Sequence, residues 1–188
     1  MTRAVARWGC FLPDLTRLAS GSSTTNLPAS ISAIGALIAR RVPCEDKDLD
    51  NMRAFELDPR LASDTTMIGR LGLCELRLMN DRRWPWLLLV PQREGVTEFH
   101  DLTPLDQTML TFETGLVSKA LKNLSGAAKI NIGALGNIVP MFHLHIVARS
   151  DGDPNWPGPV WGYGTAETYE AAAANRFAAD IRQAVLPA

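Results

Sequence analysis

Two histidines separated by a single residue, His143 and His145, are the side chains whose type and spacing in this sequence suggest chemistry. They belong to a run, Val139–Ala148, that alternates in the way expected of a β-strand. Successive strand residues point to opposite faces, so the two histidines share one face and lie roughly 6–7 Å apart along the strand. The other face carries apolar side chains suited to a core, namely Phe142, Leu144, Ile146 and Ala148.

The histidine pair is compatible with three interpretations. It can be two half-exposed strand residues that make ordinary hydrogen bonds. It can be a metal site with a third ligand such as His100, although no acidic or cysteine ligand lies near in the sequence and His100 fits a loop better than a metal site. It can also serve nucleophilic catalysis, in which a neutral imidazole attacks phosphorus or an acyl carbon while an acceptor holds its second nitrogen. Periodicity alone does not choose among the three.

The residues around the pair resemble a known family. Met141–Val147, with the sequence Met-Phe-His-Leu-His-Ile-Val, resembles the histidine triad (HIT) signature His-φ-His-φ-His-φ-φ, in which φ is apolar. Upstream, a predicted short strand over 128–132 leads into Asn131-Ile132-Gly133 and then Gly136-Asn137, which resemble the loop that precedes the HIT signature strand. Four further segments are similar to a bacterial HIT-like branch, namely Phe55–Leu61, Leu78–Asp81, Leu87–Pro91 and Asp153–Gly162.

The resemblance implies an α+β fold, with an antiparallel sheet of about five strands, a central helix and a C-terminal helix. It also implies roles for individual residues. His143 matches the middle histidine, the nucleophile of active HIT enzymes, which would attack the α-phosphorus of a nucleotide conjugate and form a nucleotidyl-histidine that water resolves. His145 matches the last histidine, which contacts the substrate phosphate. The implied nucleotide- or phosphate-binding set is Asn80, Asp81, Asn131, Gly133, Asn137 and Met141.

Two of the implied positions depart from the family pattern. Met141 occupies the first triad position, where the similar branch usually has glutamine, and a thioether is only a weak acceptor. Ile138 stands where several HIT hydrolases carry a serine that helps the leaving group. Both changes remove polar groups from the site. A nucleotide-binding or interaction protein with weak or no catalysis is therefore the alternative to a hydrolase or nucleotidyl transferase.

The ribose position is also open to two interpretations. Asn80 or Asp81 falls where HIT proteins place the acid that holds the ribose hydroxyls, but an Asn-Asp pair is equally typical of a turn. The segment Trp156–Trp161 either closes the active face or packs its tryptophans under a loop. We expect a small-molecule nucleotide as partner, homodimer formation as is common among HIT proteins, and neither a metal nor a cofactor.

The composition indicates which kinds of partner the protein is not expected to bind and which cellular compartment suits it. The chain has 188 residues, enough for one domain with a core, and a formal net charge of −1, so no overall basic field attracts nucleic acid or an anionic membrane. No apolar run reaches the roughly 18 residues of a membrane helix. The three cysteines have no metal-binding spacing, and their odd number favours reduced thiols in the cytoplasm.

Residues 1–50 differ from the remainder. Before Cys44 there are five arginines and one acid, Asp14. This composition resembles an organelle transit peptide, but it suits equally a disordered extension or a translated upstream region before a true start at Met52. We therefore divide the chain into an N-terminal extension, 1–50, and a HIT-like domain, 51–188.

Within that domain the sequence predicts the elements that must position the histidines. Asp58 is expected to cap a short helix that begins at Pro59 and ends near Ser63. Leu73–Met79, half-buried, and Trp86–Val90 are expected to form an antiparallel hairpin.

Two longer helices are predicted. Thr103 and Pro104 should begin a helix that Ser125-Gly126 ends, and Thr165 should cap a last helix that ends near Val185. In the first of these helices the expected core stripe is Leu105, Met109, Phe112, Leu116 and Ala120, with Gly115 approaching the sheet.

Overall fold

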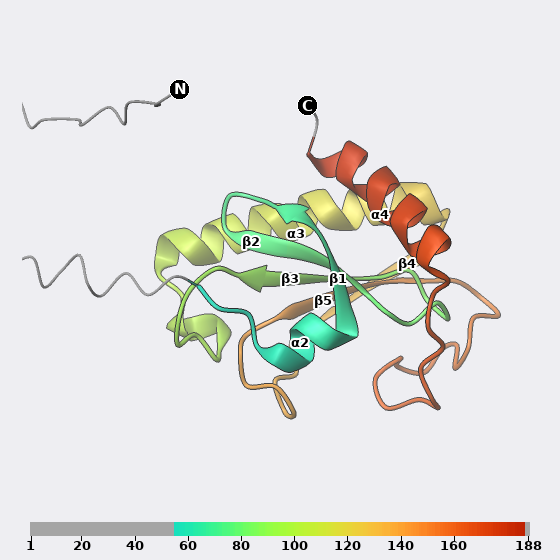
Figure 1. Cartoon of the computed structure of the whole chain (residues 1–188), viewed down its shortest axis with the longest axis horizontal. Coiled ribbons are helices and arrows are strands. Elements are labelled where there is room, and N and C mark those ends of the chain that lie inside the picture. The colour runs from blue at the N-terminus through green and yellow to red at the C-terminus, as the bar shows by residue number, and fades with distance from the viewer. Residues whose placement is uncertain (1–54, 187–188) are drawn as a thin grey trace, which may run out of the picture. The chain divides into compact units, whose positions relative to one another are not determined.

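The computed structural model describes residues 55–186 (Figure 1). Its central element is a five-stranded antiparallel sheet with the strand order β1-β2-β3-β5-β4. The predicted α+β fold is confirmed. The predicted extension 1–50 lies outside the described residues. The strands are β1 (Thr65–Arg70), β2 (Cys74–Met79), β3 (Trp86–Pro91), β4 (Lys129–Gly133) and β5 (Leu144–Arg149). The helices are α2 (Pro59–Asp64), the 3₁₀ turn η2 (Phe99–Asp101), α3 (Pro104–Ser125) and α4 (Ala171–Val185).

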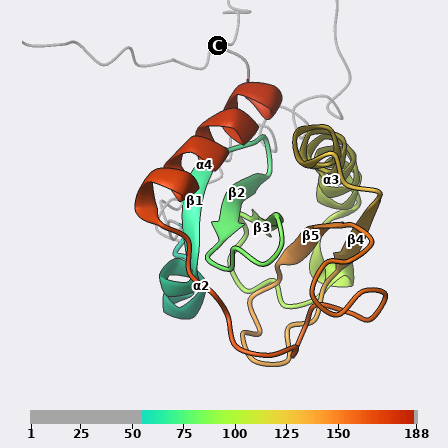
Figure 2. The same ribbon diagram turned by 90° about the vertical axis from the view of Figure 1, so that its right-hand side faces the viewer.

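The sheet is covered on both faces (Figure 2). Helices α3 and α4 pack on one face over a large apolar core, to which β5 contributes Ile146 and Ala148. On the other face, α2 and the loops on either side of β5 cover a smaller apolar cluster that includes Trp86, Leu88 and Val147. The histidine pair lies on this second face, because His145 alternates with Ile146. In the described part of the chain, no helix has the length and apolar character needed to cross a membrane.

Side-chain caps explain where two helices begin. The Asp58 carboxylate accepts a hydrogen bond from the Arg60 N–H at the start of α2, and the Thr103 hydroxyl accepts one from the Asp106 N–H at the start of α3. Gly126 ends α3 with a φ of 65°, in the left-handed region that glycine adopts without strain. These three boundaries agree with those predicted from the sequence.

The predicted start of the last helix is wrong. Helix α4 begins at Ala171 with Glu170 as its N-cap residue, not after Thr165. The preceding chain is held in another conformation because its backbone bonds to the β2–β3 loop. The Glu167 carbonyl accepts from the Arg82 N–H at 2.7 Å, and the Tyr169 N–H donates to the Asn80 side-chain oxygen at 3.0 Å.

The predicted core stripe of α3 is also wrong in part. Leu105 and Phe112 are 71% and 67% exposed, and Gly115 faces open space and not the sheet. The buried stripe consists of Asp106, Leu110, Glu113, Val117, Ala120 and Leu121. Two members of this stripe are acidic, so the apolar pattern of the sequence does not reveal it. Each acid has partners, since Glu113 accepts from the N–H groups of Leu73 and Cys74, and Asp106 forms an ion pair with Arg93 at 2.7 Å.

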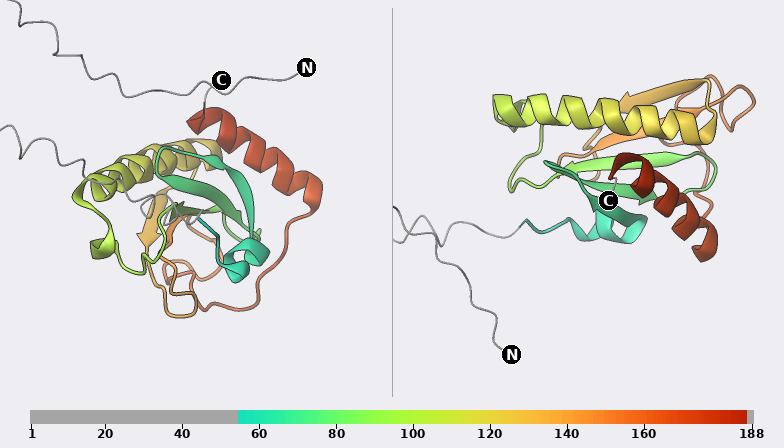
Figure 3. Two further views of the ribbon diagram at one scale, coloured as in Figure 1. Left: turned by 60° about the vertical axis from the view of Figure 1, so that its left-hand side comes forward. Right: turned by 90° about the horizontal axis from the view of Figure 1, so that it is seen from above.

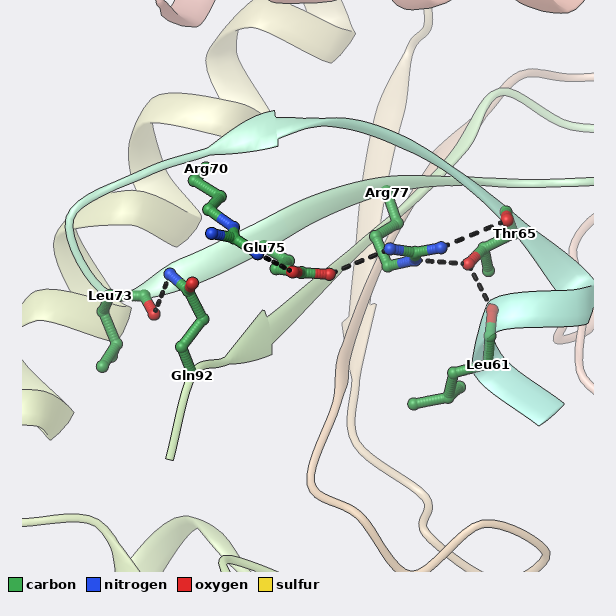
Figure 4. A network of polar contacts seen from close by, with 7 residues as sticks. All are labelled: Leu61, Thr65, Arg70, Leu73, Glu75, Arg77 and Gln92. Carbon is green, nitrogen blue, oxygen red and sulfur yellow. Dashed lines mark hydrogen bonds and ion pairs between the residues drawn. The ribbon is translucent and has the colours of Figure 1, made fainter. Parts of the chain in front are cut away.

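Strand β2 is buried on both faces and not half-buried as predicted, because the charged residues on its second face pair with each other (Figure 4). Arg77 lies 2.9 Å from Glu75, and its Nε donates to the Thr65 hydroxyl at 2.6 Å. That hydroxyl donates in turn to the Leu61 carbonyl in α2. This chain of contacts ties α2 to the sheet and so positions the side chains that α2 contributes to the cavity described below.

Removing one partner of this buried pair should be costly. We expect Arg77→Met to lower the free energy of unfolding by about 3 kcal/mol, because Glu75 is left buried with only the exposed Arg70 as partner. The double variant Glu75→Gln/Arg77→Met should lose less, since no charge is left unpaired. Urea unfolding measures both, and an equal or larger loss in the double variant would contradict this account.

Candidate active site

A cavity of about 320 Å³ opens beside the histidine pair on the second face of the sheet. His143 and His145 form part of its wall, and α2 contributes Leu61 and Asp64. The remaining wall comes from Met79 at the end of β2, from β3, from the loop 135–139 and from the loop that follows β5. Most of these side chains are apolar. The pair is thus buried from solvent, at 7% and 5% exposure, yet lies next to a space large enough for a ligand.

His143 lies just before β5, in a stretch where the predicted strand is absent. Strand β5 begins at Leu144 and not at Val139. Pro140 has no N–H to donate, and the Phe142 N–H donates to the Val96 carbonyl, so this stretch does not pair with β4. The alternation of side chains nevertheless persists, with Phe142 in the large core and Met141 against the second-face cluster.

A main-chain carbonyl fixes the tautomer of His143. Its Nδ1 lies 2.7 Å from the Met141 carbonyl oxygen. A carbonyl only accepts, so Nδ1 must carry the proton and donate it. In the neutral ring, Nε2 then holds the free lone pair. This is the state that a nucleophilic imidazole requires.

An indole fixes the tautomer of His145 in the opposite sense. The Nε1–H of Trp86 donates to Nδ1 of His145 at 3.0 Å. Because an indole N–H only donates, Nδ1 must be the bare nitrogen and the proton must lie on Nε2. Burial, and next the nearby charge of His143, lower the pKa of His145 from 6.5 to about 3. His145 is therefore neutral at ordinary pH and offers a donor.

The two rings form a close pair with complementary functions. Their centroids lie 4.8 Å apart and their planes are nearly perpendicular, at 82°. His143 offers a lone pair and His145 offers an N–H. A group that is attacked by one ring while it accepts a hydrogen bond from the other fits this arrangement, and a phosphoryl group with its non-bridging oxygens has that character.

The chain is similar in sequence and fold to known proteins. A family model for the HIT domain matches residues 60–152. The chain is 62% identical to a solved histidine triad protein from Sinorhizobium meliloti 1021, with a TM-score of 0.68 over 69% of this chain and 96% of that one. It is 41% identical to one from Bradyrhizobium japonicum, with a TM-score of 0.69 over 71% and 99% of the two chains. The chain belongs to the HIT family. HIT proteins form a superfamily of nucleotide-binding hydrolases and transferases.

Two further solved structures are similar to the chain. A HIT protein from Marinobacter aquaeolei VT8 is 41% identical, with a TM-score of 0.69 over 71% of this chain and 97% of that one. A hypothetical histidine triad nucleotide-binding protein from Sulfolobus tokodaii strain 7, at 15% identity and a TM-score of 0.51, shares the fold. No curated protein sequence matches the chain.

Asn131 and Gly133 of the HIT motif do not line the cavity. Each contacts a residue in or next to the loop that follows β5, and this loop forms part of the cavity wall. The Asn131 side-chain oxygen accepts from Arg149 at 3.1 Å. At Gly133, a Cβ atom would lie 3.1 Å from the ring of Trp161, which forms part of the cavity wall. Asn137 lies in the wall itself. The side chain of Met141 packs in the second-face cluster, and its carbonyl is the group that reaches His143.

Asn80 and Asp81 also lie outside the cavity wall. Asn80 bonds to the Tyr169 N–H, as described above, and Asp81 forms an ion pair with Arg83 at 2.6 Å. Burial opposes the charge on Asp81, yet the hydrogen bonds from Arg83 hold its pKa below the ordinary value. The acid that the structure places at the cavity is Asp64, at the end of α2, which the sequence reasoning did not select.

Of the two tryptophans in the segment 156–161, Trp161 lies at the cavity, whereas Trp156 is 37% exposed and is not packed under a loop. The ring of Trp161 lies 5.8 Å from that of His145 and 6.3 Å from that of Trp86, as part of the cavity wall. Trp156 lies over the Arg149 guanidinium, at 5.6 Å, away from the cavity.

His100 is not part of the site. Its side chain is 82% exposed in η2, with Asp101 3.8 Å away. Within residues 55–186, no three His, Cys, Asp or Glu side chains are grouped so that they could hold a metal ion. The structure thus gives the metal interpretation of His100, His143 and His145 no support.

The depressed pKa of His145 predicts a pH dependence of stability. Below about pH 6.5 the unfolded chain binds a proton at His145, whereas the folded chain does not until about pH 3. The folded state therefore loses stability as the pH falls through this window, by up to about 1.4 kcal/mol per pH unit. In urea unfolding between pH 7 and 4, we expect wild type to lose more stability than His145→Asn. Parallel curves for the two proteins would show that His145 titrates normally.

Proposed function

We propose that this HIT protein is a nucleotide hydrolase or nucleotidyl transferase that acts on the α-phosphate of a nucleotide conjugate. The observation that carries the proposal is the 2.7 Å hydrogen bond between His143 Nδ1 and the Met141 carbonyl, which leaves Nε2 as a lone-pair nitrogen beside the cavity. In the first step Nε2 forms a bond to the α-phosphorus, and the bond from phosphorus to the leaving group breaks, with its electron pair going to the leaving group.

The contacts of the two histidines suit the charges of this step. When Nε2 attacks, the His143 ring becomes cationic, and its Nδ1–H bond to the Met141 carbonyl strengthens as the charge develops. The Nε2–H of His145 offers a hydrogen bond to a phosphate oxygen. In the second step, water or another acceptor takes the nucleotidyl group and returns His143 to its neutral form. The step needs no metal.

The rest of the cavity suits a nucleoside. Apolar and aromatic side chains, among them Leu61, Met79 and Trp161, offer a surface for a base. Asp64 and Asn137 supply polar groups at the wall. We propose that Asp64 accepts hydrogen bonds from the sugar hydroxyls, in the role that the sequence suggested for Asn80 or Asp81.

A single-turnover experiment tests the covalent step. Wild-type protein is mixed with a nucleoside 5′-phosphoramidate or a dinucleoside polyphosphate, and the intact protein is weighed by mass spectrometry after rapid quenching. We expect a nucleotidyl mass on wild type and on the control His100→Ala, whose side chain is exposed and outside the cavity, but none on His143→Ala. Labelling that persists in His143→Ala would remove His143 from the nucleophile role.

The same labelling experiment, together with a measurement of melting temperature, addresses the alternative function. Met141 and Ile138 take the places of polar residues in the family pattern, and this favours a binding protein with weak or no catalysis. Nucleotide binding to wild type, seen as a rise in melting temperature, without any labelling or turnover would support that alternative.

We further propose that two copies pair through α3 and β4. Leu105 and Phe112 are exposed on α3, and Gly115 leaves open space beside them, at a cost to the isolated helix of about 1 kcal/mol relative to alanine. Strand β4, at the sheet edge, runs beside α3 (Figure 3). Its Ile132 is 50% exposed. A second copy would cover these apolar groups.

Light scattering after size exclusion tests this assembly. We expect wild type to be a dimer and Phe112→Glu to be a monomer, because a charge cannot be buried unpaired at the interface. The control is Leu124→Glu, on the same helix but on another side of it, which should remain dimeric. A dimer that survives Phe112→Glu, or a monomeric wild type, would refute the proposed surface.

We also propose a cytoplasmic location and no direct role in binding nucleic acid or membranes, given the net charge of −1. Cys74, on β2, is free and buried, and burial together with nearby Glu113 raises the pKa of its thiol. It is therefore an unreactive core residue, as suits a reducing compartment.

A further inference from the structure

The proposed reaction uses both histidines, but a third side chain decides what His145 can offer. Trp86 Nε1–H is 3.0 Å from His145 Nδ1, and both residues are buried. We propose that Trp86 is a positioning residue that holds His145 in its neutral form with the proton on Nε2, so that His145 acts as a fixed, uncharged donor to the phosphate. The mechanistic part of this inference rests on the proposed function, whereas the tautomer itself does not.

The direction of the hydrogen bond from Trp86 to His145 matters because a phosphate oxygen is an acceptor. If an acceptor held His145 Nδ1, as the Met141 carbonyl holds that of His143, then Nε2 would face the phosphate oxygens with a lone pair and repel them. An indole cannot accept a hydrogen bond, so it excludes this tautomer. It also excludes the doubly protonated ring, in which Nδ1 carries a proton and the two donors would oppose each other.

The neighbours of Trp86 hold the indole in place. Its ring contacts Trp84 and Trp161, each at a centroid distance of 6.3 Å and each close to perpendicular. In the β3–β5 ladder Trp86 pairs with Val147 and Leu88 pairs with His145, so the indole and the imidazole are diagonal neighbours on one face. Aromatic side chains can span that diagonal distance. A donor fixed in this way needs no reorganisation during the reaction.

Burial keeps His145 neutral, but few of its neighbours could choose between its two neutral tautomers. The titratable side chains that share the cavity wall with it are His143 and Asp64. The strand partners of its backbone are Leu88 on β3 and Gly133 on β4, and the loop after β5 contributes Trp161, none of which ionises. A change in the tautomer of His145 on substitution of Trp86 can therefore be assigned to the lost hydrogen bond.

The test replaces the donor and keeps the aromatic packing. Trp86→Phe removes the N–H, and 3-benzothienylalanine at position 86 removes it with the ring shape intact, which keeps the test valid if the Phe variant folds poorly. By ¹⁵N NMR at neutral pH, we expect wild-type His145 to carry its proton on Nε2. Both replacements should mix the two tautomers and raise the pKa of His145 above its wild-type value, because a hydrogen bond to the neutral ring is lost while the burial stays. Trp84→Phe, the matched control in the same cluster, should leave the tautomer unchanged.

Kinetics give the second readout. We expect both replacements at position 86 to lower kcat about tenfold, as is typical when the group that orients a functional side chain is lost, with little change in KM and with a new acid limb in the pH profile. A proton on Nδ1 of wild-type His145, or a tautomer and pH profile unaffected by the loss of the indole N–H, would overturn the inference. Failure of wild type to form the covalent intermediate would instead count against the proposed function and leave the NMR result standing.

Discussion

The hydrogen bonds on the Nδ1 atoms of His143 and His145 decide what each ring offers at Nε2. A carbonyl on one and an indole on the other produce opposite tautomers in residues that are identical in type and two positions apart. A neutral imidazole pair without such partners would populate both tautomers of each ring, and only some combinations join a nucleophile to a donor. These two hydrogen bonds thus select the combination that the proposed phosphoryl chemistry needs.

The fold supplies these two partners in different ways. The carbonyl comes from the same chain segment, because Pro140 and the Phe142 N–H bond keep residues before Leu144 out of the β ladder and allow the Met141 carbonyl to reach a ring two residues ahead. The indole comes from β3, through the register that sets Trp86 diagonally across from His145. One partner is therefore local and the other depends on the whole β2–β3–β5 arrangement.

This difference explains how much the sequence could predict. The capped starts of α2 and α3, the β2–β3 hairpin and the shared face of the histidines follow from local rules, and the structure has them. The core stripe of α3 was missed because Asp106 and Glu113 are buried with partners from distant parts of the chain, Arg93 and the Leu73 backbone. Trp86 was expected only as a strand residue, since nothing in its own segment indicates a bond to His145.

The Asn-x-Gly part of the family motif illustrates the same limit. The resemblance to the HIT family implies that Asn131 and Gly133 bind phosphate. In the structure, Asn131 bonds to Arg149, which also pairs with Asp153 at 2.7 Å and donates to the Gly158 carbonyl. These bonds fasten the loop after β5, and Gly133 leaves room for the Trp161 ring that this loop brings to the cavity.

Both motif residues therefore shape the cavity through one loop, from the opposite side to Trp86. A side chain at position 133 would displace Trp161, and loss of the Asn131 amide would leave the buried Arg149 with one acceptor fewer. Two aromatic side chains thus enclose the histidine pair. The sheet register fixes Trp86, and the Arg149 contacts hold the loop that carries Trp161. Residues outside the wall of such a cavity can be essential to the site because they determine where its walls stand.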